Sequence, residues 1–187
     1  MQKLLRLLIL TFAIIGFTLP AFGRVEAAKI AVLPIVTNED AENNAASRRV
    51  WNEVCMEQFK FPDFDMVDDT DLTVVLDAIN YNTVAKGGVN ETLIRQAMAK
   101  TNADLAVMVV MEELSLEPLT SIGHEDIYRL TQKGNIMLVN NISGKVKSDR
   151  INETDDFNYA VTVRSDFIHD QLRNTLIREL KRVTKVK

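Results

Sequence analysis

An uninterrupted apolar run at residues 105–111 limits the architectures that are open to this chain. Its residues, Leu-Ala-Val-Met-Val-Val-Met, show no alternation between polar and apolar side chains. A strand has this composition when both of its faces are covered, as in the middle of a sheet between two layers. Alternation begins only at Glu112–Glu117, which indicates a half-exposed continuation. We therefore predict a central strand at about 103–116.

Helical and extended patterns alternate before this central strand. A β-branched run and a shorter run entered through Pro62 predict two strands. Apolar residues that recur at i, i+3, i+4 and i+7 predict helices between the strands and at the end of the chain. The predicted strands are at about 29–36 and 62–67, and the predicted helices are at about 45–60, 70–80, 91–100 and 165–184.

Turn signals divide the region after the central strand into short segments. Lys-Gly-Asn at 133–135 and Ser-Gly at 143–144 are both typical of hairpin turns. They predict three antiparallel strands at about 126–131, 136–142 and 145–151. Together with the earlier elements, these strands predict an α/β sandwich of two or three layers with a mixed sheet.

The start of the chain has the order of a secretory signal peptide. Lys3 and Arg6 precede a mostly apolar run at 7–22, and small residues follow the run at two points. This order is typical of an export leader, and the run is short for a membrane span. Cleavage after Gly23, cleavage after Ala27 and retention of the leader as an anchor all remain open.

Without the signal peptide at 1–27, the chain is predicted to form a single α/β domain at 28–187. We expect this domain to be exported to the periplasm or cell envelope of a bacterium. Contact with a membrane is expected only through the leader, if the leader is not cleaved.

The charge balance argues against a nucleic-acid partner. The chain carries 22 Lys and Arg against 26 Asp and Glu, a formal net charge of −4. An acidic body repels nucleic-acid phosphates. The basic stretch at 164–187 fits the carboxyl end of a helix, where cations offset the helix dipole, better than it fits a nucleic-acid site.

Few residues support catalysis or metal binding. His124 and His169 are the only histidines, and neither forms a metal-binding pair. The acidic cluster at 63–71 lacks the glycine and the distal glutamate of a calcium loop, and it predicts a helix cap instead. Cys55 has apolar neighbours and is interpreted as a core residue rather than a reactive thiol. With neither a nucleophile elbow nor a phosphate-binding loop, we expect no catalytic site, no metal and no cofactor.

The predicted leader and the few candidate catalytic residues support two hypotheses about function. The first is an exported, non-enzymatic protein-binding or scaffold module whose partners are other envelope proteins or further copies of the chain. The alternative is a secreted hydrolase or a small-ligand-binding protein with a site near His124, Glu125 and Asp126. A pocket with converging titratable groups at those residues would favour the alternative.

Apolar residues in the predicted antiparallel region point to an interaction edge. Tyr128, Leu130, Ile136 and Leu138 give this region more apolar surface than one helix is expected to cover. We therefore expect an exposed strand edge there, which another chain can extend by strand pairing.

Four short segments in series carry a family resemblance: Lys29–Ile35, Phe64–Asp68, Ala103–Val110 and Asn140–Val146. Over 29–183 the chain resembles the periplasmic α/β domain of the curli secretion protein CsgG, the amino-terminal domain of TolB and the penicillin-binding-protein activator lipoproteins. The resemblance implies a non-enzymatic envelope domain that binds other proteins, sometimes as an oligomer. The chain lacks the lipidated cysteine of the lipoproteins and the extra strands of the secretion channel, so pore formation is not implied.

Overall fold

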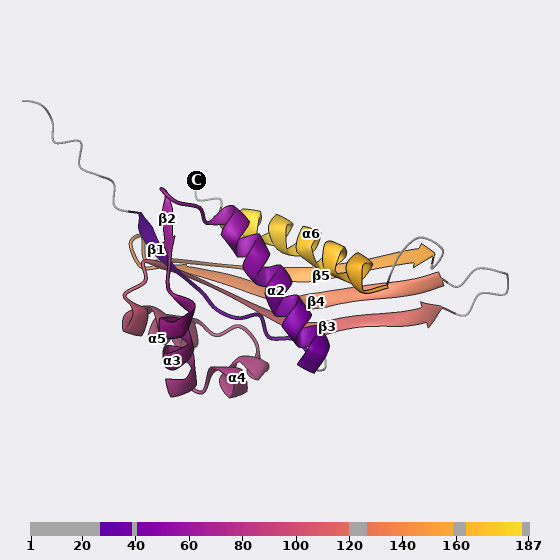
Figure 1. Ribbon diagram of the computed structural model, residues 1–187, viewed down its shortest axis with the longest axis horizontal. Coiled ribbons are helices and arrows are strands. Elements are labelled where there is room, and N and C mark those ends of the chain that lie inside the picture. The colour runs from indigo at the N-terminus through magenta and orange to yellow at the C-terminus, as the bar shows by residue number, and fades with distance from the viewer. Residues whose placement is uncertain (1–26, 39–40, 120–126, 159–163, 185–187) are drawn as a thin grey trace, which may run out of the picture.

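The chain folds into a five-stranded sheet with helices packed on it (Figure 1). The computed structural model describes residues 27–38, 41–119, 127–158 and 164–184, so most of the predicted leader lies outside the described residues. The strands are β1 (Ala28–Val32), β2 (Phe64–Met66), β3 (Leu105–Leu119), β4 (Ile127–Asn140) and β5 (Lys145–Asn158). The helices are α2 (Ala41–Gln58), α3 (Asp69–Ala78), α4 (Tyr81–Val84), η1 (Ala85–Gly87), α5 (Glu91–Thr101) and α6 (Arg164–Thr184).

The sheet is mixed, as the sequence predicts. Its strand order is β2-β1-β3-β4-β5, in which β1 is parallel to β2 and β3, while β3, β4 and β5 are antiparallel neighbours. The side chains of 106–110 on β3 are at most 3% exposed. This burial confirms the prediction of a central strand that is covered on both faces.

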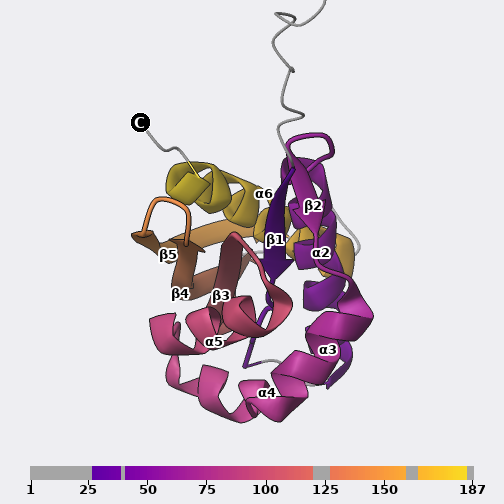
Figure 2. The same cartoon turned by 90° about the vertical axis from the view of Figure 1, so that its left-hand side faces the viewer.

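Helices cover both faces of the sheet around β1 and the first half of β3. On one face lie α2 and α6, whose Trp51 and Leu176 are buried with Val109. On the other face lie α3, α4 and α5, and Met98 of α5 is buried there with Met108. Figure 2 shows the sheet between these two groups of helices. Successive residues of β3 therefore enter different cores, which explains the absence of polar alternation.

The far halves of β3, β4 and β5 extend past the second group of helices. β1 pairs with β3 only from Leu105 to Val107, and one further bridge joins Val36 to Val110. β3 then continues against β4 as far as Leu119. In Figure 1 this part of the sheet extends to the right, beyond α3, α4 and α5. The fold thus has three layers at one end and two at the other.

The predicted turn at 133–135 is wrong, because β4 runs through it without a break. Gly134 is paired with Met111 of β3, beside a register shift in β3. A Cβ atom on Gly134 would overlap the carbonyl oxygen of Val110. The glycine therefore permits a close approach of the β3 backbone instead of forming a turn. The turn predicted at 143–144 is confirmed, since β4 and β5 are joined there.

Other bounds differ from the prediction for local reasons. β1 ends at Val32, before Pro34, which cannot donate a ladder hydrogen bond. α2 begins at Ala41, earlier than predicted, and residues between the helices predicted at 70–80 and 91–100 form α4 and η1. β5 continues to Asn158 because it pairs with β4 along its whole length.

Candidate functional site

The residues predicted to form an interaction edge lie on β4, which is paired on both sides. β3 and β5 flank β4 along its length. Leu130, Ile136 and Leu138 are at most 3% exposed, because two helices cover this face rather than one. Tyr128 stacks on Phe157 of β5, with ring centroids 6.2 Å apart. The prediction of an edge at these four residues is therefore wrong.

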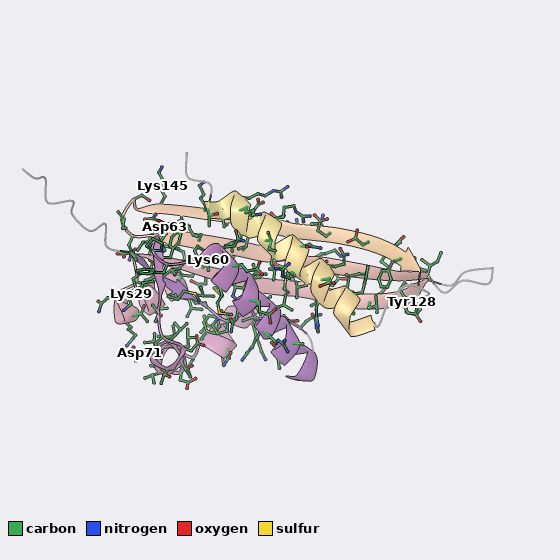
Figure 3. All side chains as sticks on the ribbon, turned by 45° about the horizontal axis from the view of Figure 1, so that its top comes forward. Lys29, Lys60, Asp63, Asp71, Tyr128 and Lys145 are labelled. Carbon is green, nitrogen blue, oxygen red and sulfur yellow. The ribbon has the colours of Figure 1, made fainter. Side chains whose placement is uncertain are left out.

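The open edge in this region is β5. Among the described residues β5 pairs only with β4, so no strand pairs with the backbone groups on the outer side of its 14 residues. The backbone amide of Arg150 donates to the side chain of Asp149. The opposite edge strand, β2, has only 3 residues. Figure 3 shows the length of the ladder formed by β4 and β5, with Tyr128 at one end and Lys145 at the other. We therefore take the outer edge of β5 as the candidate functional site.

Ion pairs to α6 hold β5 against the helical layer. The guanidinium of Arg178 donates to the carboxylate of Glu153, with an N–O distance of 2.6 Å. Further along the helix, the guanidinium of Arg182 lies 3.9 Å from the carboxylate of Asp149. Side chains alternate along a strand, so odd-numbered residues of β5 face α6 and even-numbered residues face away from it. These pairs join the face of β5 that is turned toward α6 to the helical layer.

On the face away from α6, charged side chains pair across the strands. Arg129 of β4 donates two hydrogen bonds, of 2.7 and 2.8 Å, to the carboxylate of Asp156. They hold the pKa of Asp156 below its usual value and raise the pKa of Arg129. The ammonium of Lys133 donates a 2.7 Å hydrogen bond to Glu113, whose pKa is also lowered. At the end of the sheet that α3, α4 and α5 do not cover, this face is therefore polar.

Charge is distributed unevenly along β5. Lys145 and Lys147 lie at its start, Arg150 lies near its middle, and Asp155 and Asp156 lie near its end. All of these side chains except that of Lys147 are exposed. Charged residues on an edge strand limit unselective pairing with other chains. This dense charge is the sequence signal that could have identified the edge, whereas the apolar residues of the region pointed to β4.

Residues that the sequence singled out for other chemistry have structural roles. Cys55 is fully buried, and burial raises the pKa of its thiol, which confirms the core interpretation. Asp68 accepts a hydrogen bond from the backbone amide of Thr70 at the start of α3, which confirms the helix cap. Within the described ranges, no group of three or more His, Cys, Asp or Glu side chains could hold a metal ion.

The residues of the alternative site, His124–Asp126, lie outside the described residues. The second histidine, His169, lies on α6 beside an open groove of about 540 Å³ between α2 and α6. Arg49 and Arg173 also line the groove, and each is paired with a glutamate of α2. Small-molecule sites are mostly apolar and enclosed, so this charged groove has the character of a solvated seam between two helices. No described helix is long and apolar enough to span a bilayer.

The architecture is therefore an α/β sandwich with a long, charged open edge. No protein-family model matches the chain, and no curated protein matches it. Among solved structures, the hypothetical protein CT253 from Chlamydia trachomatis matches with a TM-score of 0.52 and 11% sequence identity, over 86% of this chain and 99% of that chain. This match shows that the fold is shared with a bacterial protein.

Weaker structural matches include two other bacterial proteins. Lipoprotein GNA1162 from Neisseria meningitidis has a TM-score of 0.43 and 13% identity, over 83% of this chain and 99% of that chain. The PelC dodecamer from Paraburkholderia phytofirmans has a TM-score of 0.41 and 13% identity, over 84% of this chain and 89% of that chain.

Proposed function

We propose that this protein is an exported, non-enzymatic module of the bacterial cell envelope that binds a protein chain along β5. The observation that carries the proposal is the outer edge of β5, which is 14 residues long and has no strand beside it within the described chain. An extended segment that adds to such an edge gains main-chain hydrogen bonds along its length. Side chains at alternate positions then supply selectivity.

Two further features support this function. The apolar leader at 7–22 predicts export. The resemblance of 29–183 to the envelope domains of CsgG, TolB and the activator lipoproteins implies a domain that acts by binding other proteins.

Site-specific photo-crosslinking in cells tests the binding surface. A photoreactive amino acid replaces Arg150, which is exposed on β5, and a matched control replaces Lys86, which is exposed in η1 on the other helical layer. We expect a protein adduct from position 150 and none from position 86. No adduct from position 150, or the same adducts from both positions, would contradict the proposal.

Export is tested separately, by mass spectrometry of the protein recovered from cell fractions. We expect the protein in the periplasmic or envelope fraction, with a mass that corresponds to loss of the leader after Gly23 or Ala27. Recovery of the full-length chain from the cytosol alone would contradict an envelope function.

A further inference from the structure

We infer that the protein chain paired with β5 is the β5 strand of a second copy, aligned antiparallel about a twofold axis. This inference rests on the proposed function, because it names the occupant of the same edge. The order of charges along the strand favours this pairing. β5 is basic at its start, with Lys145 and Lys147, and acidic near its end, with Asp155 and Asp156. A strand with this order is complementary to itself when two copies run antiparallel.

These charges also select one register of the two strands. A twofold axis at Arg150 places Lys145 opposite Asp155 and Lys147 opposite Glu153, and symmetry repeats both opposite-charge pairs. The only like-charge pair in this register is Arg150 opposite itself. Opposite charges on directly facing residues of antiparallel strands are stabilising.

Neighbouring registers are less favourable. In a twofold antiparallel pair, facing residues share one face of the sheet, so the register can change only in steps that keep odd residues opposite odd residues. An axis at Ile151 places Lys147 opposite Asp155 but also Asp149 opposite Glu153, each twice by symmetry, so attraction and repulsion offset each other. An axis at Asp149 keeps one attractive pair, Lys145 opposite Glu153, twice by symmetry, and places the carboxylate of Asp149 opposite itself. Compared with these two registers, the axis at Arg150 therefore gives more opposite-charge pairs relative to like-charge pairs.

The position of α6 is compatible with this pairing. The twofold axis is perpendicular to the sheet, so α6 of both copies would lie on the same face of the continuous sheet. α6 contacts both β4 and β5 and crosses these strands obliquely in Figure 1. Pairing of the two β5 strands would therefore bring the two α6 helices close together across the twofold axis.

The side chains of β5 that face away from α6 leave this approach open. Ser148, Asn152 and Thr154 are small or medium-sized, polar and exposed. Asp156 is directed toward Arg129 on β4 by its two hydrogen bonds. A second strand can therefore approach β5 without burying a bulky apolar side chain.

Single-cysteine variants test the register in the purified mature protein. Arg150→Cys is expected to form a disulfide-linked dimer under mild oxidation, because position 150 faces itself. Lys145→Cys alone is expected to remain unlinked, because its two copies would be roughly 33 Å apart, ten residues at about 3.3 Å each. An equimolar mixture of Lys145→Cys and Asp155→Cys is expected to give the linked heterodimer. The buried Cys55 remains in all variants, and the unmodified protein serves as its control.

Charge reversal tests the same pairing without a covalent bond. Lys145→Glu and Asp155→Lys, each alone, are expected to weaken dimerisation at least tenfold in sedimentation equilibrium, because each places like charges opposite each other twice. Mixing the two variants is expected to restore dimerisation, since every pair at these positions is then attractive. The charge-matched control Lys86→Glu, in η1, is expected to dimerise like the unmodified protein.

Three results would overturn the inference: an unmodified protein that stays monomeric at high concentration, linkage of Lys145→Cys to itself as readily as Arg150→Cys, or no recovery of dimerisation when the charge-reversed variants are mixed.

The adduct formed at position 150 in cells separates this inference from the proposed function. An adduct with the mass of two copies of this chain supports both. An adduct with a different protein overturns the inference alone, and the absence of any adduct overturns the proposed function.

Discussion

At the scale of single residues, two polar side chains are buried between α6 and the sheet, Glu179 of α6 and Gln132 of β4, and they differ in whether they have partners. Glu179 is 1% exposed and forms ion pairs with Arg178 at 2.8 Å and Arg182 at 2.9 Å. Gln132 is also 1% exposed, yet neither of its amide atoms has a hydrogen-bond partner in the described part of the chain. An unpaired buried amide destabilises a fold by about 1–3 kcal/mol.

Replacing Gln132 with methionine tests this cost. Methionine has a similar length and no amide to desolvate, so Gln132→Met is expected to raise the free energy of unfolding by about 1–3 kcal/mol. Urea denaturation measures the change. The control Gln96→Met, at an exposed position of α5, is expected to change stability by less than about 0.5 kcal/mol. A loss of stability in Gln132→Met would show that the amide is satisfied.

At the scale of elements, β4 is one strand because it has a partner strand on each side. A Lys-Gly-Asn sequence is typical of a hairpin turn when the flanking segments are short and pair with each other. Here both segments pair with β3 and β5 instead, and Gly134 lies where the β3 backbone approaches most closely. The local sequence predicts a turn at this glycine, but its role depends on β3, a strand that is distant in the chain.

Gly134→Ala is expected to lower the free energy of unfolding by about 3 kcal/mol. The added Cβ would overlap the carbonyl oxygen of Val110 and lie 2.9 Å from the Cα atom of Met111, and backbone atoms cannot move aside as a side chain can. Thermal or urea unfolding measures the effect. Gly87→Ala is the control, since its added methyl group would have no heavy atom within 4 Å, and it is expected to be close to neutral.

The cross-strand ion pairs on the polar face predict a dependence of stability on acidity. The pKa values of Asp156 and Glu113 are lower in the folded protein than their ordinary values, because Arg129 and Lys133 donate hydrogen bonds to them. The unfolded chain therefore binds more protons in acid, and the stabilisation is lost as the pH falls from about 5 through the folded pKa values. Chemical unfolding at a series of pH values is expected to show this loss. The double variant Glu113→Gln/Asp156→Asn is expected to have a shallower acid dependence, and an unchanged slope would contradict the assignment.

At the scale of the whole molecule, the two ends of the sheet differ in how they are buried. β1 and the first half of β3 lie between two helical layers, whereas the far halves of β3, β4 and β5 have helices on one face only. Local stability follows the extent of burial around each backbone hydrogen bond. The two-layer end also carries part of the open edge, so the least protected backbone coincides with the proposed binding surface.

Hydrogen exchange measured by mass spectrometry is expected to reflect this difference. Amides at 105–110 of β3 are expected to exchange most slowly, and amides at 113–119 and along β5 faster. Pairing with a second copy should slow exchange along β5 as the protein concentration rises. Equal protection along the whole of β3 would contradict the division into three-layer and two-layer ends.

The sequence by itself determined the local elements. The apolar run at 105–111 identified the central strand, helical spacing located α2, α3, α5 and α6, and Ser-Gly at 143–144 marked the turn between β4 and β5. These features depend on residues close together in the chain, where periodicity and turn preference act directly. The mixed sheet followed from the order of the elements.

Only the tertiary structure decided which strand is open. The number of helices on one face buried Leu130, Ile136 and Leu138, and the pairing of β4 with β3 and β5 left β5 as the long edge. The ion pair that joins Arg178 to Glu153 likewise depends on how α6 packs on the sheet. Such contacts join residues far apart in the chain, and their free energy depends on burial and neighbours that local sequence patterns do not contain.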